Sequence, residues 1–241
     1  VWGYPIIGDV KSWDETFHAN NISFGRLENG SYVFLPDSSL DLFKGRLAVQ
    51  DYSTGSAIGE LQVTQGEKWW DCCAGAGGKS LKLKSFFPDL EIWVSDIRAS
   101  ILDQLSSRFS QAAITNYKIL RADVSRNIPE KLPVFDGIIA DVPCSGSGTW
   151  SRAPEHLSFF NNTEIIKFSE VQFNILNNVW QHLKPGGTLI YITCSVFEME
   201  NEMVINKFIE KRNASVTRQH YIDGYRMGAE NIFVCHLRKE Q

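Results

Sequence analysis

Two cysteines stand in turn-forming tetrads, each directly after a strongly apolar run. Cys144 ends the tetrad Asp-Val-Pro-Cys, and Cys194 lies within Ile-Thr-Cys-Ser. Because such runs form buried strands, both cysteines are predicted at the carboxyl ends of strands, where ligands bind in an open α/β sheet. A thiolate is a good nucleophile. Two thiols that lie in the same ligand-binding crevice therefore indicate a covalent reaction rather than side chains packed in the core.

A glycine-rich segment, Asp71–Ser80, reads Asp-Cys-Cys-Ala-Gly-Ala-Gly-Gly-Lys-Ser and is predicted to join a strand to a helix. A phosphate-binding P-loop is excluded, since Cys73 stands where its first glycine must be. The dinucleotide fingerprint fits only weakly, because Ser80 replaces its third glycine. What remains is an acid followed by a Gly-x-Gly-Gly turn, as in class I methyltransferases that bind S-adenosylmethionine. A plain tight turn is the alternative.

Two further carboxylates are expected at the same edge of the sheet. Asp96 ends the predicted second strand, 25 residues past Asp71, where a carboxylate can accept hydrogen bonds from ribose hydroxyls. Asp123 follows the third strand and is placed for an adenine ring. Taken alone, an aspartate at either position is more often a helix cap or a turn residue.

Composition limits the class of protein. The chain has 241 residues, 43% of them hydrophobic, which is enough for one sizeable core with a small appended lobe. Its apolar runs fall far short of the roughly 18 residues of a membrane span. The first residues lack both an initiating Met and the pattern of a signal peptide, so we expect a trimmed chain or an internal piece of a longer one.

Cysteine usage and charge give further expectations. Five cysteines without a regular framework are typical of a reducing compartment, so a cytoplasmic location is expected. Their spacing does not suit zinc, and no metal is predicted. A net charge of −4 argues against a surface that is basic all over, although a local basic groove for nucleic acid stays open.

Short β-rich runs alternate with amphipathic segments from about residue 68 onward, which predicts crossover units and a mainly parallel sheet. The predicted strands span 68–71, 91–96, 117–121, 135–141, 188–193, 215–221 and 231–238. The predicted helices span 53–62, 79–87, 99–110, 164–182 and 200–211. Residues 1–46, with several turn formers and a strand-like piece at 31–35, form a small lobe, and residues 47–241 form the main domain.

Two local signals predict helix ends. The run Lys-Pro-Gly-Gly at 184–187 should stop the long helix, because proline cannot donate a backbone hydrogen bond and glycine accepts the left-handed cap. Ser195 and Glu198 have capping-box spacing, which predicts a helix start just beyond Cys194. A helix start there would favour the thiolate form of Cys194.

With these residues in view, the chain resembles the Sun/Fmu-type RNA (cytosine-5)-methyltransferases over residues 47–238. The segments that carry the resemblance are Val-Gln-Asp-x-Ser at 49–53, the glycine loop at 71–79, Asp-x-Pro-Cys-Ser-Gly-x-Gly at 141–148, Arg-x-Pro at 152–154, and Thr-Cys-Ser at 193–195 followed by Glu-Asn at 200–201. The family's usual loop has Ala-Pro where this chain has Gly75 and Ala76. The Lys-Trp pair often found after Pro154 is replaced by Leu157 and Ser158.

The resemblance implies an α/β, Rossmann-like class I methyltransferase fold with a mainly parallel seven-stranded sheet, helices on both faces and a small amino-terminal lobe. It implies S-adenosylmethionine as cofactor and structured RNA as partner, ribosomal RNA ahead of transfer RNA, bound by a monomer. The cofactor residues it implies are Cys73, Ala74, Gly75, Ala76, Gly77, Gly78, Lys79, Asp96, Asp123 and Asp141. Arg152, Pro143 and Asn201 are the implied RNA contacts.

The same resemblance makes Cys194 the nucleophile and Cys144 the residue that aids product release. Carbon 5 of cytosine is a weak nucleophile until a thiolate adds to carbon 6. Asp141 can contribute near ring nitrogen 3. Lys79, Arg152 and the predicted helix start after Cys194 are the candidates for the positive surroundings that the thiolate needs. Two other hypotheses stay open: a catalytically idle RNA-binding assembly factor, and a small-molecule or protein methyltransferase, which would explain the glycine loop but not the cysteines.

Overall fold

The computed structural model describes residues 1–6, 10–126, 128–129 and 131–240. Its main feature is a sheet of seven strands in the order β10-β11-β9-β8-β5-β6-β7. The parallel strands are β5 (Lys68–Asp71), β6 (Glu91–Asp96), β7 (Tyr117–Arg121), β8 (Phe135–Asp141) and β9 (Leu183–Thr193). The hairpin of β10 (Ala214–Ile222) and β11 (Ile232–Lys239) completes the sheet, with β11 antiparallel to β9.

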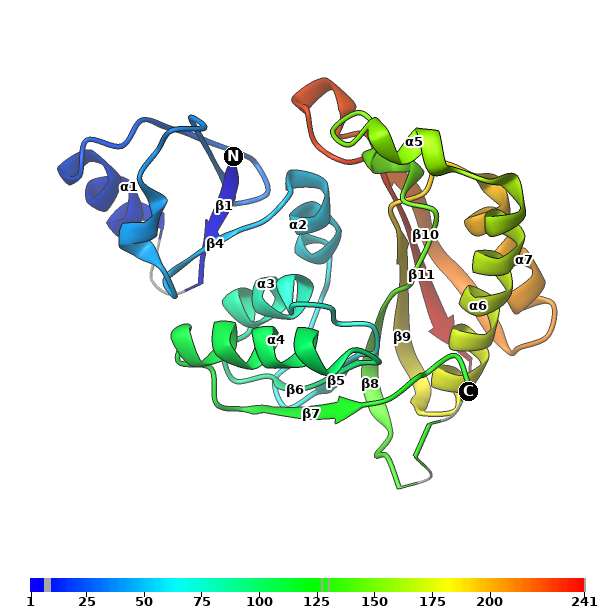
Figure 1. Cartoon of the computed structure of the whole chain (residues 1–241). Helices are drawn as coiled ribbons and strands as arrows, with labels where there is room; N and C mark the ends of the chain where they lie inside the picture. Colours follow the sequence, from blue (N-terminus) through cyan, green and yellow to red (C-terminus); the bar gives the residue numbers. More distant parts are fainter. Residues whose placement is uncertain (7–9, 127, 130, 241) are drawn as a thin grey trace.

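Helices cover both faces of this sheet (Figure 1). One face carries α2 (Tyr52–Gly59), α3 (Gly78–Phe86) and α4 (Ala99–Gln111), and the other carries α6 (Asn162–Trp180) and α7 (Glu202–Ile209). Neighbouring side chains of β5 point to opposite faces. Trp69 accordingly packs into the core beneath α3 and α4, whereas Trp70 packs into the core beneath α6 and α7. The predicted mainly parallel sheet with helices on both faces is confirmed.

The amino-terminal lobe is a small antiparallel sheet in the order β2-β3-β1-β4, with one helix. Its elements are β1 (Trp2–Pro5), α1 (Val10–Ala19), β2 (Phe24–Arg26), β3 (Tyr32–Phe34), η1 (Leu40–Phe43) and β4 (Leu47–Val49). Because β4 pairs with β1, the lobe's sheet continues to Val49, past the predicted boundary at residue 46. Tyr4 of the lobe donates a hydrogen bond to the carbonyl of Gly78 at 3.1 Å, so the lobe contacts the start of α3.

Two predicted helix ends differ from the structure. The long helix ends at Trp180, because the backbone of Phe135 bonds to His182 and Leu183 already pairs in β9. The predicted capping box is wrong: the hydroxyl of Ser195 donates to Glu200, a 3-10 turn η3 (Glu198–Glu200) follows, and α7 starts only at Glu202. The start of α7 is therefore farther from Cys194 than predicted.

Short helical segments complete the fold. They are η2 (Ser147–Thr149), α5 (Glu155–Phe159) and η4 (Tyr225–Met227). Within the described ranges, no helix combines the length and the apolar character that crossing a membrane requires.

Candidate functional site

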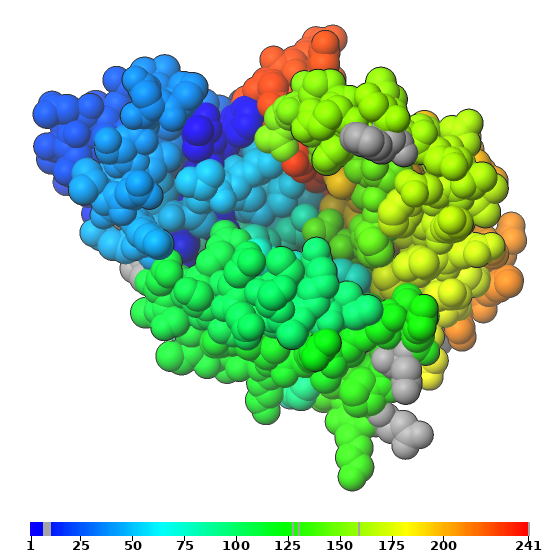
Figure 2. Space-filling view, viewed as in Figure 1, coloured from blue at the N-terminus to red at the C-terminus, as the bar shows by residue number. Residues whose placement is uncertain are grey.

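The loops that follow β5, β8 and β9 meet at the carboxyl edge of the sheet. Strand order changes direction between β5 and β8, which is where ligands bind in such folds. A cavity of about 610 Å³ opens at this point. Figure 2 shows this face of the molecule hollowed between the lobe and α2 on one side and α5 and α6 on the other.

Eight of the predicted site residues line this cavity: Cys73, Gly75, Asp96, Asp123, Asp141, Pro143, Cys144 and Cys194. The structure thus brings both cysteines and the carboxylates from three strand ends, Asp96, Asp123 and Asp141, to one place. Ala74, Ala76, Gly77, Gly78, Lys79, Arg152 and Asn201 are not among the lining residues. Lys79 nevertheless belongs to the site, because it is ion-paired to the lining residue Asp141.

The sulfur atoms of Cys144 and Cys194 are 3.3 Å apart. A backbone hydrogen bond of 2.9 Å from Gly148 to the carbonyl of Cys194 joins the two loops next to them. The hydrogen bond with Cys194, together with burial, raises the pKa of Cys144 well above its ordinary value. Cys144 therefore keeps its proton, which suits it to exchange a proton rather than to attack. Cys72 and Cys235 are buried free cysteines.

Lys79 pairs with one of the carboxylates that line the cavity. Its ammonium nitrogen is 2.5 Å from an oxygen of Asp141. Burial alone lowers the pKa of Lys79, but the charges of Asp141, Asp71 and Cys194 outweigh it and raise the pKa above its ordinary value. Lys79 is thus a permanent cation close to the Cys194 sulfur, where positive charge favours a thiolate.

Asp71, at the end of β5, is fully buried. One of its oxygens accepts a 2.6 Å hydrogen bond from Ser80, while the other, Oδ1, has no partner among the described residues. Burial raises the pKa of Asp71 to about 7, the hydrogen bond from Ser80 opposing that rise. The unpartnered oxygen leaves an acceptor available at the base of the glycine loop.

Asp96 is held as an ionised carboxylate. The backbone N–H of Gly75 donates to it at 3.1 Å, and the guanidinium of Arg98 donates to both of its oxygens at 2.9 and 3.0 Å. Burial acts to raise its pKa, but these donors lower it below the ordinary value. Sequence reasoning missed Arg98, which also lines the cavity; its position two residues after Asp96 was the available signal.

Asp123 has the surroundings of a turn residue as well as a place in the cavity. Its carboxylate accepts hydrogen bonds from the backbone and hydroxyl of Ser125 at 3.1 and 2.6 Å. Arg126 lies 3.4 Å from its other oxygen. Asp123 can therefore be both a turn residue and a residue of the cavity, because a turn of this kind fixes the position of its carboxylate.

The three predicted RNA contacts have different surroundings. Pro143 is exposed beside Cys144. Arg152 is partly exposed and forms ion pairs with Asp51, at 3.2 Å, and with Glu230. Asn201 is buried, and its amide group bonds to Thr193, to the carbonyl of Ser195 and to Tyr221. Their role toward RNA stays a prediction.

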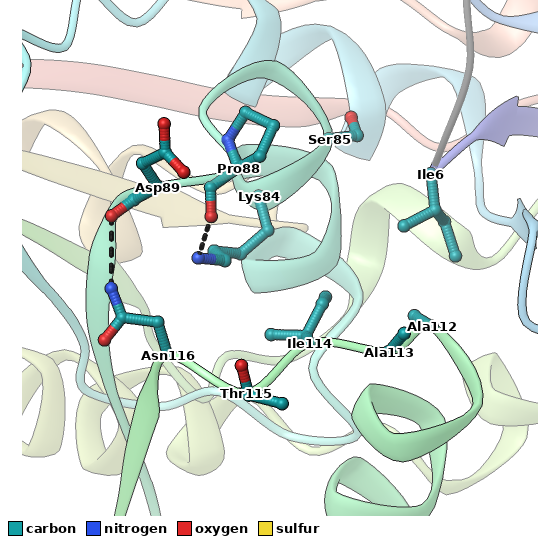
Figure 3. Close-up of a pocket in the computed structure, with 10 residues that line it drawn as sticks. All are labelled: Ile6, Lys84, Ser85, Pro88, Asp89, Ala112, Ala113, Ile114, Thr115 and Asn116. Carbon is teal, nitrogen blue, oxygen red and sulfur yellow. Dashed lines mark hydrogen bonds between the residues drawn. The ribbon is translucent and has the colours of Figure 1, made fainter.

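A second cavity, of about 570 Å³, lies at the far ends of α3 and α4 (Figure 3). Its lysine, Lys84, donates to the carbonyls of Pro88 and Leu90, and Asn116 donates to the carbonyl of Asp89 at 3.1 Å. The polar groups of Lys84 and Asn116 thus already donate to backbone carbonyls, and no cysteine lines this cavity. The part of the chain that the structure describes also contains no cluster of three or more His, Cys, Asp or Glu suited to a metal ion.

Comparison with known proteins agrees with the geometry. The family model "16S rRNA methyltransferase RsmB/F" matches residues 59–238. Proteins described as ribosomal RNA small subunit methyltransferase B are 32% identical over 174 residues in Klebsiella pneumoniae and 32% over 181 residues in Erwinia tasmaniensis. These matches cover 70% and 72% of this chain but only 39% and 40% of those proteins. The chain thus spans about two fifths of their length.

Solved structures share the fold. A methyltransferase homolog from Pyrococcus horikoshii superimposes with a TM-score of 0.86 and 21% identity, covering 99% of this chain and 86% of that one. NSun6 from Pyrococcus horikoshii, solved with SFG, superimposes with a TM-score of 0.77 and 19% identity over 87% of this chain and 57% of that one. The amino-terminal lobe is included in the first of these matches, since nearly the whole chain is covered.

Proposed function

Because the chain belongs to the RsmB/F family of 16S rRNA methyltransferases, we propose that it methylates carbon 5 of cytosine in RNA through a covalent bond to Cys194. The observation that carries this proposal is the pair of sulfur atoms 3.3 Å apart at the mouth of the cavity. A small-molecule or protein methyltransferase needs the glycine loop but has no use for that pair. Ribosomal RNA is the proposed substrate, by analogy with the relatives' names.

The residues present fit S-adenosylmethionine, which supplies the methyl group when bound. The cavity volume lies in the ordinary range of ligand sites, roughly 300 to 1,000 Å³. Asp96 offers ionised oxygens suited to ribose hydroxyls, and we assign Asp123, which lines the same cavity, to the adenine end. The unpartnered oxygen of Asp71 suits an ammonium group. At Gly75 the backbone is open, with no heavy atom within 4 Å of where a Cβ would be. We propose that the rest of the loop, Cys73–Lys79, shapes the same pocket.

The protein groups have distinct proposed roles. The thiolate of Cys194, stabilised by Lys79, adds to carbon 6 of cytosine, and carbon 5 becomes nucleophilic enough to take the methyl group. The proton on carbon 5 then passes to a water molecule, and the electron pair of that C–H bond re-forms the double bond between carbons 5 and 6. The bond between carbon 6 and sulfur breaks at the same time, so that Cys194 leaves as a thiolate and the ring becomes aromatic again. Cys144, which keeps its proton, assists this release. Asp141 orients the base near nitrogen 3.

An aromatic cluster next to the cysteine loops supports an RNA substrate. Trp150 and Phe160 have ring centroids 4.8 Å apart, and Phe160 stacks on Phe197 at 5.4 Å. All three are half-buried, with the exposed apolar Val196 beside them. Unstacked bases bind such rings, at roughly 1 to 3 kcal/mol per base. The target cytosine must leave its stack to reach the thiol, and we propose Pro143, Arg152 and Asn201 as further contributors to that surface.

Methyl transfer from labelled S-adenosylmethionine to ribosomal RNA, followed by nucleoside analysis, tests the proposal. We expect 5-methylcytidine from the native chain and a loss of at least roughly 1,000-fold with Cys194→Ala, since removal of a nucleophile costs about that much or more. Cys235→Ala, a buried cysteine away from the cavity, is the control. Undiminished transfer by Cys194→Ala would rule out the mechanism, and binding of RNA without any transfer would identify an assembly factor. The same assay with transfer RNA shows which of the two RNAs is the substrate.

We expect a monomer acting in the cytoplasm.

A further inference from the structure

A buried carboxyl group, that of Glu200, connects the two cysteine loops. Glu200 is fully buried at the end of η3, behind the cavity. Its oxygen Oε1 accepts from the backbone of Ser145 at 2.7 Å and from the amide of Gln172 at 3.3 Å. Its other oxygen, Oε2, accepts from the hydroxyls of Ser145, at 2.5 Å, and of Ser195. One oxygen atom thus bonds to the residue that follows each cysteine.

Stability alone does not explain this carboxyl group. Within the described ranges, no lysine, arginine or histidine lies within ion-pair distance of Glu200. Burying a carboxylate with only neutral donors is unfavourable, and apolar residues of similar volume are often as stable. Four donors do match the acceptor-only chemistry of a carboxylate. The Glu200 carboxylate, whose burial is unfavourable for stability, therefore lies at the point where the two cysteine loops are held together.

The two loops depend on Glu200 to different degrees. The Cys194 loop has a second anchor, because Asn201 accepts from Thr193 and donates to the carbonyl of Ser195. The backbone N–H and the hydroxyl of Ser145, next to Cys144, both donate to Glu200 itself. The Cys144 loop is also held by the bond from Gln172 to the carbonyl of Pro143 and by the backbone bond from Gly148 to Cys194. Loss of the carboxyl group should therefore free Ser145, directly beside Cys144, more than it frees Ser195.

We propose that Glu200 is a positioning residue that holds the Cys144 sulfur against the Cys194 sulfur and thereby sets the rate of product release. This inference rests on the proposed function, because release is the step assigned to Cys144. Displacement of a reacting group by about 1 Å lowers a rate by roughly 100-fold. Glu200 touches neither RNA nor cofactor in this account, so binding of both should be preserved when it is changed.

Glu200→Gln tests the inference, with Glu198→Gln as the matched control. An amide nitrogen in place of Oε1 would face two N–H donors and lose both of those bonds. In place of Oε2 it could donate to the two hydroxyls, but Ser145 and Ser195 would then have to turn their own O–H groups away from residue 200. In either orientation the bonds that hold Ser145 change. We expect kcat to fall roughly 10- to 100-fold with KM for RNA and cofactor within about twofold. Covalent RNA–protein complex should accumulate on denaturing gels, as expected for Cys144→Ala. Glu198, an exposed residue of the same turn, should give native values when changed.

Two outcomes would overturn the inference. One is native kcat in Glu200→Gln. The other is a parallel loss of turnover, cofactor affinity and melting temperature without adduct, which would mark a merely structural role. If Glu200→Gln does not fold, Ser145→Ala tests the same inference, because it removes one donor and keeps the carboxyl group. We expect the covalent RNA–protein complex to accumulate in this variant too, to a smaller extent. Failure of the native chain to make 5-methylcytidine would instead overturn the proposed function.

Discussion

At the scale of single residues, the site separates two similar thiols by their surroundings. The hydrogen bond with Cys194 and burial raise the pKa of Cys144, whereas Lys79 and Cys194 interact electrostatically. The tetrads alone identified both cysteines as candidates. Their 3.3 Å separation and the buried Glu200 between their loops depend on residues 50 to 56 positions apart, which no local pattern contains.

Asp71 gives a prediction at this scale. Its pKa is about 7 in the fold and about 3.9 in the unfolded chain. Between these values the folded state holds a proton that the unfolded state has lost, so stability falls as pH rises, by at most about 1.4 kcal/mol per pH unit. Asp71→Asn stays neutral, so its stability relative to the native chain should improve from about pH 4 to about pH 7 and then level off. Urea unfolding of both proteins at several pH values measures this, and a constant difference would contradict it.

At the scale of elements, most of the sheet could be predicted from sequence. The strands at 68–71, 91–96, 117–121 and 135–141 match β5, β6, β7 and β8, because short β-rich runs alternate there with helix-length amphipathic segments. Where the sequence offered two possible hydrogen-bond partners for one side chain, tertiary contacts determined which bond formed. Ser195 had a capping-box partner in Glu198, but its hydroxyl bonds to the more deeply buried Glu200. Arg98 was missed because its bond to Asp96 is visible only once the strand end is built.

The glycine loop gives a prediction at the scale of elements. Gly77 has φ +79°, and a Cβ there would lie 2.8 Å from Leu105 and 3.0 Å from Phe109 of α4. Gly77→Ala therefore combines left-handed strain, about 1 to 2 kcal/mol, with overpacking, about 1 to 3 kcal/mol. Gly66→Ala is the control, since Gly66 has φ +89° but open space around its Cβ position. Denaturant unfolding should show the larger loss for Gly77→Ala; equal losses would mean that α4 does not pack against the loop as described.

At the scale of the whole molecule, the net charge and the share of its relatives that the chain spans bear on how strongly it should bind RNA. Its net charge is −4, and it spans about two fifths of its curated relatives. The lobe joins the main domain through contacts such as Tyr4 to Gly78, so the hollow in Figure 2 is bordered by both parts. In the proposed function, RNA binding then depends on a limited basic and aromatic surface.

The resulting expectation is weak RNA binding with a steep salt dependence. Each phosphate contact releases counterions and adds about −0.7 to −0.9 to the slope of log K against log salt. We expect a clear fall in affinity between about 50 and 200 mM salt, measured by fluorescence anisotropy with labelled RNA. Tight binding that does not change with salt would contradict a surface of this kind.

The central claim is that the sulfur of Cys194 bonds to the target base. Its most direct test is mass spectrometric mapping of the covalent complex that Cys144→Ala forms with RNA in the presence of S-adenosylmethionine, after digestion of protein and RNA. The account predicts one modified peptide, containing Cys194 joined to a methylated cytidine, and no complex when Cys194 is also changed to alanine. A cross-link at any other residue, or a complex that persists in the double variant, would contradict it.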